Sequence, residues 1–134
     1  MRTLKGLPGI VALSIDGFNG NVSFEGTVIS ENYIPPVLLN GFNNYGGGFA
    51  PVGYYKDKMG IVHLHGLANT GGNPVGLNIF TLPAGYRPSS GKIIFSVMNN
   101  NGVSRIDVLT DGSVQVQAGA AGWFALDQIS FRAD

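Results

Sequence analysis

The chain has 134 residues, the size of one domain, and eight basic and eight acidic residues give it a formal net charge of zero. Charged residues make up only 12% of the chain and form no basic stripe, so nucleic acids and anionic membrane surfaces are poor candidate partners. No apolar run approaches the roughly 18 residues of a membrane span, which argues against membrane insertion. The absence of cysteine excludes disulfides, thiolate metal sites and cysteine nucleophiles.

The first 36 residues differ in pattern from the rest of the chain. Two β-rich stretches, Gly9–Ile15 and Asn21–Ser30, would make a ribbon that is marginal alone in water. Such a ribbon must pack on the main domain or on copies of itself. Pro35 and Pro36 then form a stiff joint, because neither can donate a backbone hydrogen bond. We predict a β segment at 1–36 and a separate main domain at 37–134.

Beyond this joint, apolar residues recur at period two and no capped segment of helical period appears. The strongest local signal is Asp111-Gly112, a turn dipeptide between two alternating stretches. We therefore predict an all-β fold of short strands, an antiparallel sandwich or jelly roll. The expected strands are Pro51–Asp57, Ile61–Leu67, Leu77–Leu82, Lys92–Met98, Arg105–Thr110, Ser113–Ala118 and Trp123–Ala133.

Several segments in order resemble the C-terminal head domain of bacteriophage tail-fibre and receptor-binding proteins. The resemblance rests on Tyr55–Asp57, Gly60–Leu67, Phe80–Ser89, Arg105–Val108 and Gly122–Ala133, and covers most of residues 40 to 134. It implies a homotrimeric, non-enzymatic head at the tip of a fibre or baseplate of the virion, with residues 1–36 as its neck. It also implies two kinds of partner, other phage tail or baseplate proteins and a saccharide of the bacterial surface.

Two histidines, His63 and His65, lie two residues apart on one predicted strand and so share a face. In a trimer this pair could surround an axial metal with six imidazoles, a donor set that suits iron, nickel, zinc or copper. In the other interpretation His63 hydrogen-bonds locally, His65 faces solvent, and Ile61 and Leu67 pack on the same face. Members of the family often have a basic residue in place of His65, so the resemblance assigns this position no shared role. We predict no cofactor.

Saccharide recognition needs aromatic faces for the apolar side of a sugar and amides for its hydroxyl groups. One loop, Asn43, Asn44 and Tyr45, has this chemistry, as do Asn100 and Trp123. We take these five residues as candidate ligand contacts. For Trp123 the alternative is a place in the core, and for Asn100 an ordinary role in an Asn-rich turn.

Catalytic motifs are absent from the sequence. It contains no Gly-x-Ser-x-Gly elbow, no phosphate loop and no His-Glu-x-x-His, and the spacing of its carboxylates does not demand a glycosidase pair. The main hypothesis is a non-enzymatic receptor-binding head. The alternatives are a structural cap that trimerises and ends a fibre, and a small glycan-processing enzyme.

Overall fold

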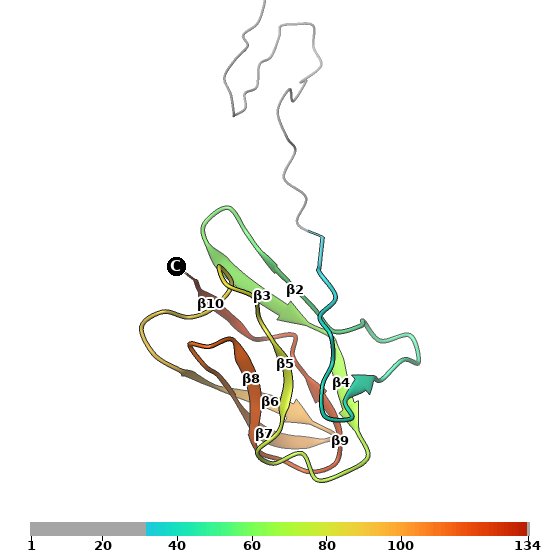
Figure 1. Cartoon of the computed structure of the whole chain (residues 1–134). Coiled ribbons are helices and arrows are strands. Elements are labelled where there is room, and N and C mark those ends of the chain that lie inside the picture. Colours follow the sequence, from blue (N-terminus) through green and yellow to red (C-terminus); the bar gives the residue numbers. More distant parts are fainter. Residues whose placement is uncertain (1–31, 134) are drawn as a thin grey trace, which may run out of the picture. The chain divides into compact units, whose positions relative to one another are not determined.

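The structure, a computed structural model, describes residues 32–133, and all of their regular elements are β-strands paired in antiparallel fashion (Figure 1). One sheet has seven strands in the order β1 (Asn43–Asn44), β4 (Leu67–Thr70), β9 (Gly122–Ala125), β6 (Ile93–Asn99), β7 (Gly102–Val108), β8 (Ser113–Ala118) and β5 (Asn78–Thr81). The second has three, in the order β10 (Ser130–Arg132), β3 (Ile61–His65) and β2 (Gly53–Lys56). The predicted all-β fold is confirmed.

The predicted neck, residues 1–36, lies outside the described residues except for its last five and stays a prediction. Within those five, Ile34 forms an antiparallel bridge with Tyr54 of β2 through two backbone hydrogen bonds of 2.7 and 3.1 Å. The described part of the chain contains no helix that is long and apolar enough to cross a membrane.

The core lies where alternating apolar side chains of the strands meet. The predicted hairpin is confirmed, since β7 pairs with β8 and Gly112 has a φ of +92° in the turn between them. Burying each large side chain contributes about 2 kcal/mol to stability. The largest side chains that are fully buried are Phe80, Phe124, Leu64, Ile79, Leu82, Ile106, Leu126, Ile129, Val62, Val108, Val114 and Val116.

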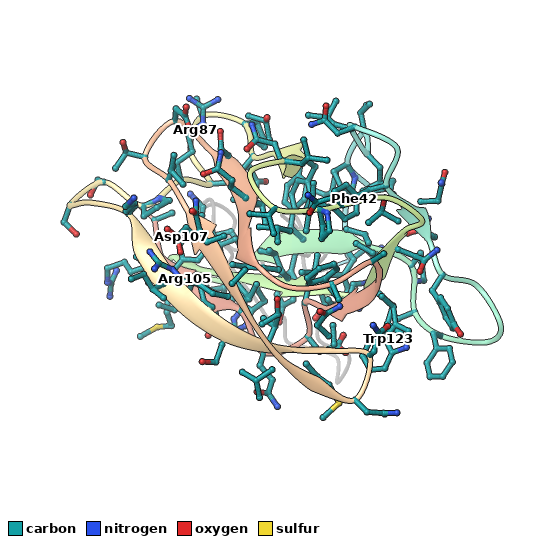
Figure 2. All side chains as sticks on the ribbon, turned by 90° about the horizontal axis from the view of Figure 1, so that it is seen from below. Phe42, Arg87, Arg105, Asp107 and Trp123 are labelled. Atoms are coloured by element: carbon teal, nitrogen blue, oxygen red, sulfur yellow. The ribbon has the colours of Figure 1, made fainter. Side chains whose placement is uncertain are left out.

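One carboxylate, that of Asp107, is fully buried in the seven-stranded sheet. Arg105 donates to both of its oxygens, at 2.9 and 3.0 Å, and Lys92 Nζ lies 3.7 Å away. Asp107 in turn raises the pKa of Arg105, first through these hydrogen bonds. Two cations thus compensate the buried charge, and Figure 2 shows the Arg105–Asp107 pair well apart from Trp123.

A corner at Gly66 divides the strand that we predicted at Ile61–Leu67 into β3 and β4, which belong to different sheets. Gly66 has a φ of +100°, and a Cβ there would lie 2.5 Å from the Val52 nitrogen and overlap the Pro51 carbonyl. The prediction of one continuous strand was therefore wrong, because the sequence pattern does not reveal the turn of the backbone. Leu67 consequently does not share the face of His63 and His65.

The predicted last strand, Trp123–Ala133, is divided in the same way, into β9 and β10. The two divided segments lie side by side and change sheets together. At the crossing, Leu126 N donates to Gly66 O at 2.9 Å and Gly66 N donates to Asp127 Oδ1 at 2.8 Å. Leu64 N donates to Ile129 O at 3.0 Å on the other side of the corner.

We expect Gly66→Ala to lower the free energy of unfolding by about 3 kcal/mol or more, because it adds a steric overlap to the strain of a positive φ. The matched control is Gly76→Ala, where φ is +87° and no atom lies within 4 Å of an added Cβ. This control should cost only about 1–2 kcal/mol, the strain of the left-handed backbone. Urea unfolding of both variants measures the difference, and equal losses would show that the close packing at the corner is unimportant.

Candidate ligand-binding face

The outer side of the β1–β4–β9 end of the large sheet carries a polar and aromatic row. Asn43 lies opposite Asn69, and Asn69 lies opposite Trp123. Directly opposed residues of antiparallel strands point to the same side of the sheet. The neighbouring positions Ala68 and Phe124 are fully buried, so the row that contains Trp123 faces outward.

This geometry brings together two candidates far apart in the sequence, Asn43 and Trp123. It also rules out the alternative that Trp123 fills the core, because Phe124 does so and Trp123 keeps part of its surface exposed. Asn69, which joins them, was missed by the sequence analysis. It lies between two of the predicted strands, Ile61–Leu67 and Leu77–Leu82, and no sequence signal marked it.

The loop after β1 presents two aromatic rings to solvent. Tyr45 is 46% exposed and Phe49 is 55% exposed, and their ring centroids lie 5.7 Å apart. Three consecutive glycines, Gly46 to Gly48, separate them, all with positive φ, and this backbone returns Phe49 towards Tyr45. Phe49 was not among the predicted contacts, although its place behind three glycines is a usable signal.

The side chain of Asn44 serves the backbone of this loop. Its Oδ1 accepts a hydrogen bond of 2.8 Å from Val52 N, which ties the start of the loop to its end. Asn43 donates through Nδ2 to Gly41 O at 3.2 Å and is exposed. Of these two candidates, Asn43 therefore has more capacity left for a ligand, because no hydrogen bond from residues 32–133 reaches its amide oxygen.

Two consecutive asparagines hold Trp123 in place, Asn99 at the end of β6 and Asn100 in the turn that follows. The buried Asn99 donates to Ala120 O and to Trp123 O at 3.1 and 3.0 Å, and accepts from Ala120 N at 2.7 Å. Asn100 donates to Ala121 O at 3.0 Å and accepts from Trp123 N at 3.2 Å. Asn100 thus lies beside the face with both polar atoms engaged, which is the geometry of a positioning residue.

His63 and His65 share the outer face of the small sheet as predicted, but each has its own neighbours. His63 Nε2 donates to Asp57 Oδ2 at 2.9 Å. This bond is the main reason why the pKa of Asp57 is lowered, followed by the bond from Ile61 N. The ring of His65 stacks on Tyr33 with centroids 3.4 Å apart, so His65 does not simply face solvent.

Within residues 32–133, no three His, Cys, Asp or Glu side chains gather in a way that could hold a metal ion. An axial metal would need the histidines of three chains, so His63 and His65 as its ligands stay a prediction. The chemistry that the face of Asn43, Asn69 and Trp123 can offer is different. It combines an aromatic surface with neutral amides, which suits contacts with an uncharged polar ligand such as a sugar.

Comparison with known proteins agrees with this architecture. No protein-family model and no curated protein matches the sequence. Among solved structures, the chain is similar to the receptor binding protein (gp15) of Listeria phage PSA, with a TM-score of 0.63 and 18% identity. The match covers 77% of this chain. The chain has the fold of a phage receptor-binding protein.

The predicted resemblance to receptor-binding heads is thus confirmed at the level of the fold. The alignment covers 65% of the Listeria phage protein, so the chain corresponds to part of that protein's length. The identity of 18% carries no residue-level correspondence, and the five predicted contact residues stay predictions.

The pKa of His65 makes stability depend on pH. Burial lowers this pKa from its ordinary value of 6.5, and the nearby charge of Asp127 opposes the shift. The unfolded chain then takes up the proton at a higher pH than the folded chain does. The stabilisation is complete above pH 6.5 and is lost as the pH falls through the lower folded pKa.

Thermal unfolding at a series of pH values should show this loss in the natural chain and a flatter profile in His65→Phe. Phenylalanine keeps a flat ring against Tyr33 but has no group that titrates. An unchanged profile in His65→Phe would assign the pH dependence to other groups.

Proposed function

We propose that this protein is the receptor-binding head of a bacteriophage and attaches the virion to a saccharide of the bacterial surface without catalysis. The observation that carries the proposal is the fold likeness to a Listeria phage receptor binding protein. The outward row of Asn43, Asn69 and Trp123 supports it, because this row offers the chemistry that a sugar ring needs.

The head acts as a homotrimer joined to other tail-fibre or baseplate proteins at the tip of the particle. An uncharged face of this kind binds a single sugar weakly. Three heads in a trimer, and several trimers on a particle, raise the overall affinity because each further contact becomes intramolecular. The mass in solution tests this part of the proposal, since a trimer should have about three times the 14.1 kDa of the chain.

Attachment is tested with fluorescently labelled full-length protein on a panel of bacterial strains that begins with Listeria. We expect decoration of some strains. Trp123→Ala should raise the protein concentration needed for half-saturation about thirty-fold, the typical effect of losing a central aromatic contact. The matched control is Met59→Ala, which truncates a 71% exposed side chain in the turn between β2 and β3.

Equal melting temperatures of the two variants would show that the loss is one of binding. If the natural chain decorates cells and Trp123→Ala binds as well as Met59→Ala, the assignment of this face is wrong. A trimer that decorates none of the strains would favour the structural cap. Release of sugar from purified envelopes by the protein would favour the enzyme.

A further inference from the structure

A hollow of about 340 Å³ lies where the two sheets separate, beside β6. The strands β6 and β9 are joined by a single residue pair, Asn99 with Phe124. The rest of β6, which precedes this pair in the chain, pairs with β7 in the large sheet. The chain after β9, in contrast, crosses to β10 in the small sheet. The hollow is the space between these diverging segments, and its volume is within the range of small-molecule sites.

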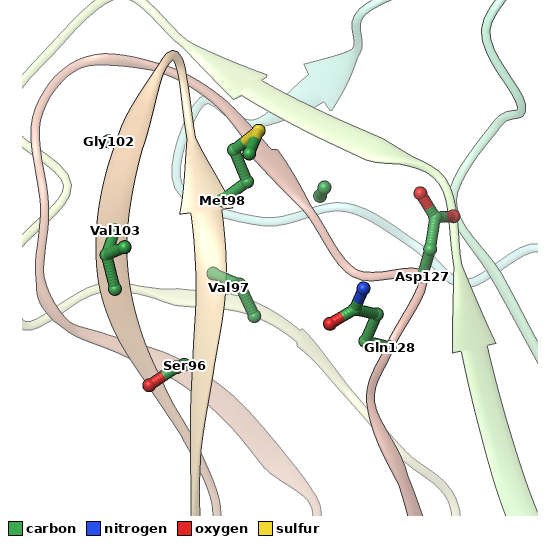
Figure 3. Close-up of a pocket in the computed structure, with 8 residues that line it drawn as sticks. Ser96, Val97, Met98, Gly102, Val103, Asp127 and Gln128 are labelled. Atoms are coloured by element: carbon green, nitrogen blue, oxygen red, sulfur yellow. The ribbon is translucent and has the colours of Figure 1, made fainter.

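The walls of the hollow differ in chemistry, as Figure 3 shows. Asp127 and Gln128, on the segment that leaves β9, form a polar wall. Met98 and Val103, from β6 and β7, form an apolar wall on the other side. Ser96 adds a hydroxyl group. An apolar surface with a few convergent polar groups is the usual composition of a ligand site.

The carboxylate of Asp127 is anchored to the corner through one of its two oxygens. Its Oδ1 accepts the 2.8 Å hydrogen bond from Gly66 N at the corner between the sheets. Among the described residues no other hydrogen bond reaches this carboxylate, so Oδ2 can accept one from a ligand. A carboxylate accepts from hydroxyl, amide or ammonium groups and repels carboxylates and phosphates.

The apolar wall is unusually exposed for side chains of its type. Val103 is 81% exposed and Met98 is 54% exposed, and they lie opposite each other on β7 and β6. Such a pair fits the C–H face or a methyl substituent of a sugar, and the flexible methionine can adapt to its shape.

The hollow also continues the face proposed above to bind saccharide. Ala125, which lines the hollow, lies two residues after Trp123 on β9, so both point to the outer side of the sheet. A ligand with more than one sugar could therefore contact Trp123 with one residue and the hollow with the next.

We infer that the hollow is a saccharide subsite that selects one neutral or ammonium-bearing sugar and excludes acidic ones through Asp127. The inference rests on the proposed attachment to saccharides and deepens it by naming the class of sugar. Gln128 and Ser96 supply further hydrogen bonds, and Met98 and Val103 hold the apolar side of the ring.

The test uses the ¹⁵N-labelled full chain, titrated separately with glucose, N-acetylglucosamine, glucosamine and glucuronic acid. We expect at least one of the first three to shift the backbone amide signals of Ala125, Asp127 and Gln128, and glucuronic acid to leave them unchanged. In Asp127→Asn the affinity for the binding sugars should fall about ten-fold, because a charge-assisted hydrogen bond is lost. The preference for these sugars over glucuronic acid should fall as well.

Asp127→Asn is informative because the asparagine oxygen can still accept the bond from Gly66 N and preserve the corner. A second pair of variants tests the apolar wall without touching Asp127. Val103→Asn should weaken sugar binding, whereas Ile94→Asn, at a 58% exposed position of β6 outside the hollow, should not.

The outcomes separate this inference from the proposed function. Decoration of cells by the natural chain, combined with no shifts at the hollow for any of the four sugars, would overturn the subsite and leave the attachment role standing. Equal binding of glucuronic acid would overturn the selection by charge. Specific shifts at the hollow support the subsite even where the strains chosen for the decoration test are not hosts.

Discussion

The rest of the structure depends on the hydrogen bonds of one residue, Gly66. Its carbonyl accepts from Leu126 N and its N–H donates to Asp127 Oδ1, so two long segments change sheets at one point. Because its φ is positive and the Pro51 carbonyl lies directly against it, no other residue type fits this position without strain. The corner closes the core between the sheets and also opens the space beside β6.

A second constraint, the pair Asn99 and Asn100, links the fold to the outer face. Their amides bond the backbone of Ala120 and Ala121, which precede β9, and that of Trp123 within it. A buried amide with all these bonds satisfied fixes its neighbours in one arrangement. The position of Trp123 therefore depends on a turn more than twenty residues before it, and a change at Asn99 would reach the face without contacting any ligand.

Much of the strand content could be predicted from the sequence, because alternation and turn dipeptides act locally. The hairpin around Asp111-Gly112 is the clearest case. The two corners could not, because neither Gly66 nor the pair Asp127-Gln128 shows by itself that the chain changes sheets there. The candidate site shows the same contrast between features set by local sequence and features set by pairing of distant segments. Residue chemistry singled out Trp123 and Asn43, but Asn69 and the hollow arise from pairings between segments distant in the chain, for which a single sequence carries no signal.

The row of Asn43, Asn69 and Trp123 contains no ionisable group, and the ion pair of Arg105 with Asp107 lies elsewhere on the sheet. Dissolved salt screens attraction between charges but leaves ring contacts and amide hydrogen bonds almost unchanged. Adhesion through these three residues would therefore be nearly independent of ionic strength. A particle held by this row alone would keep the same affinity for its host in dilute freshwater and in brine.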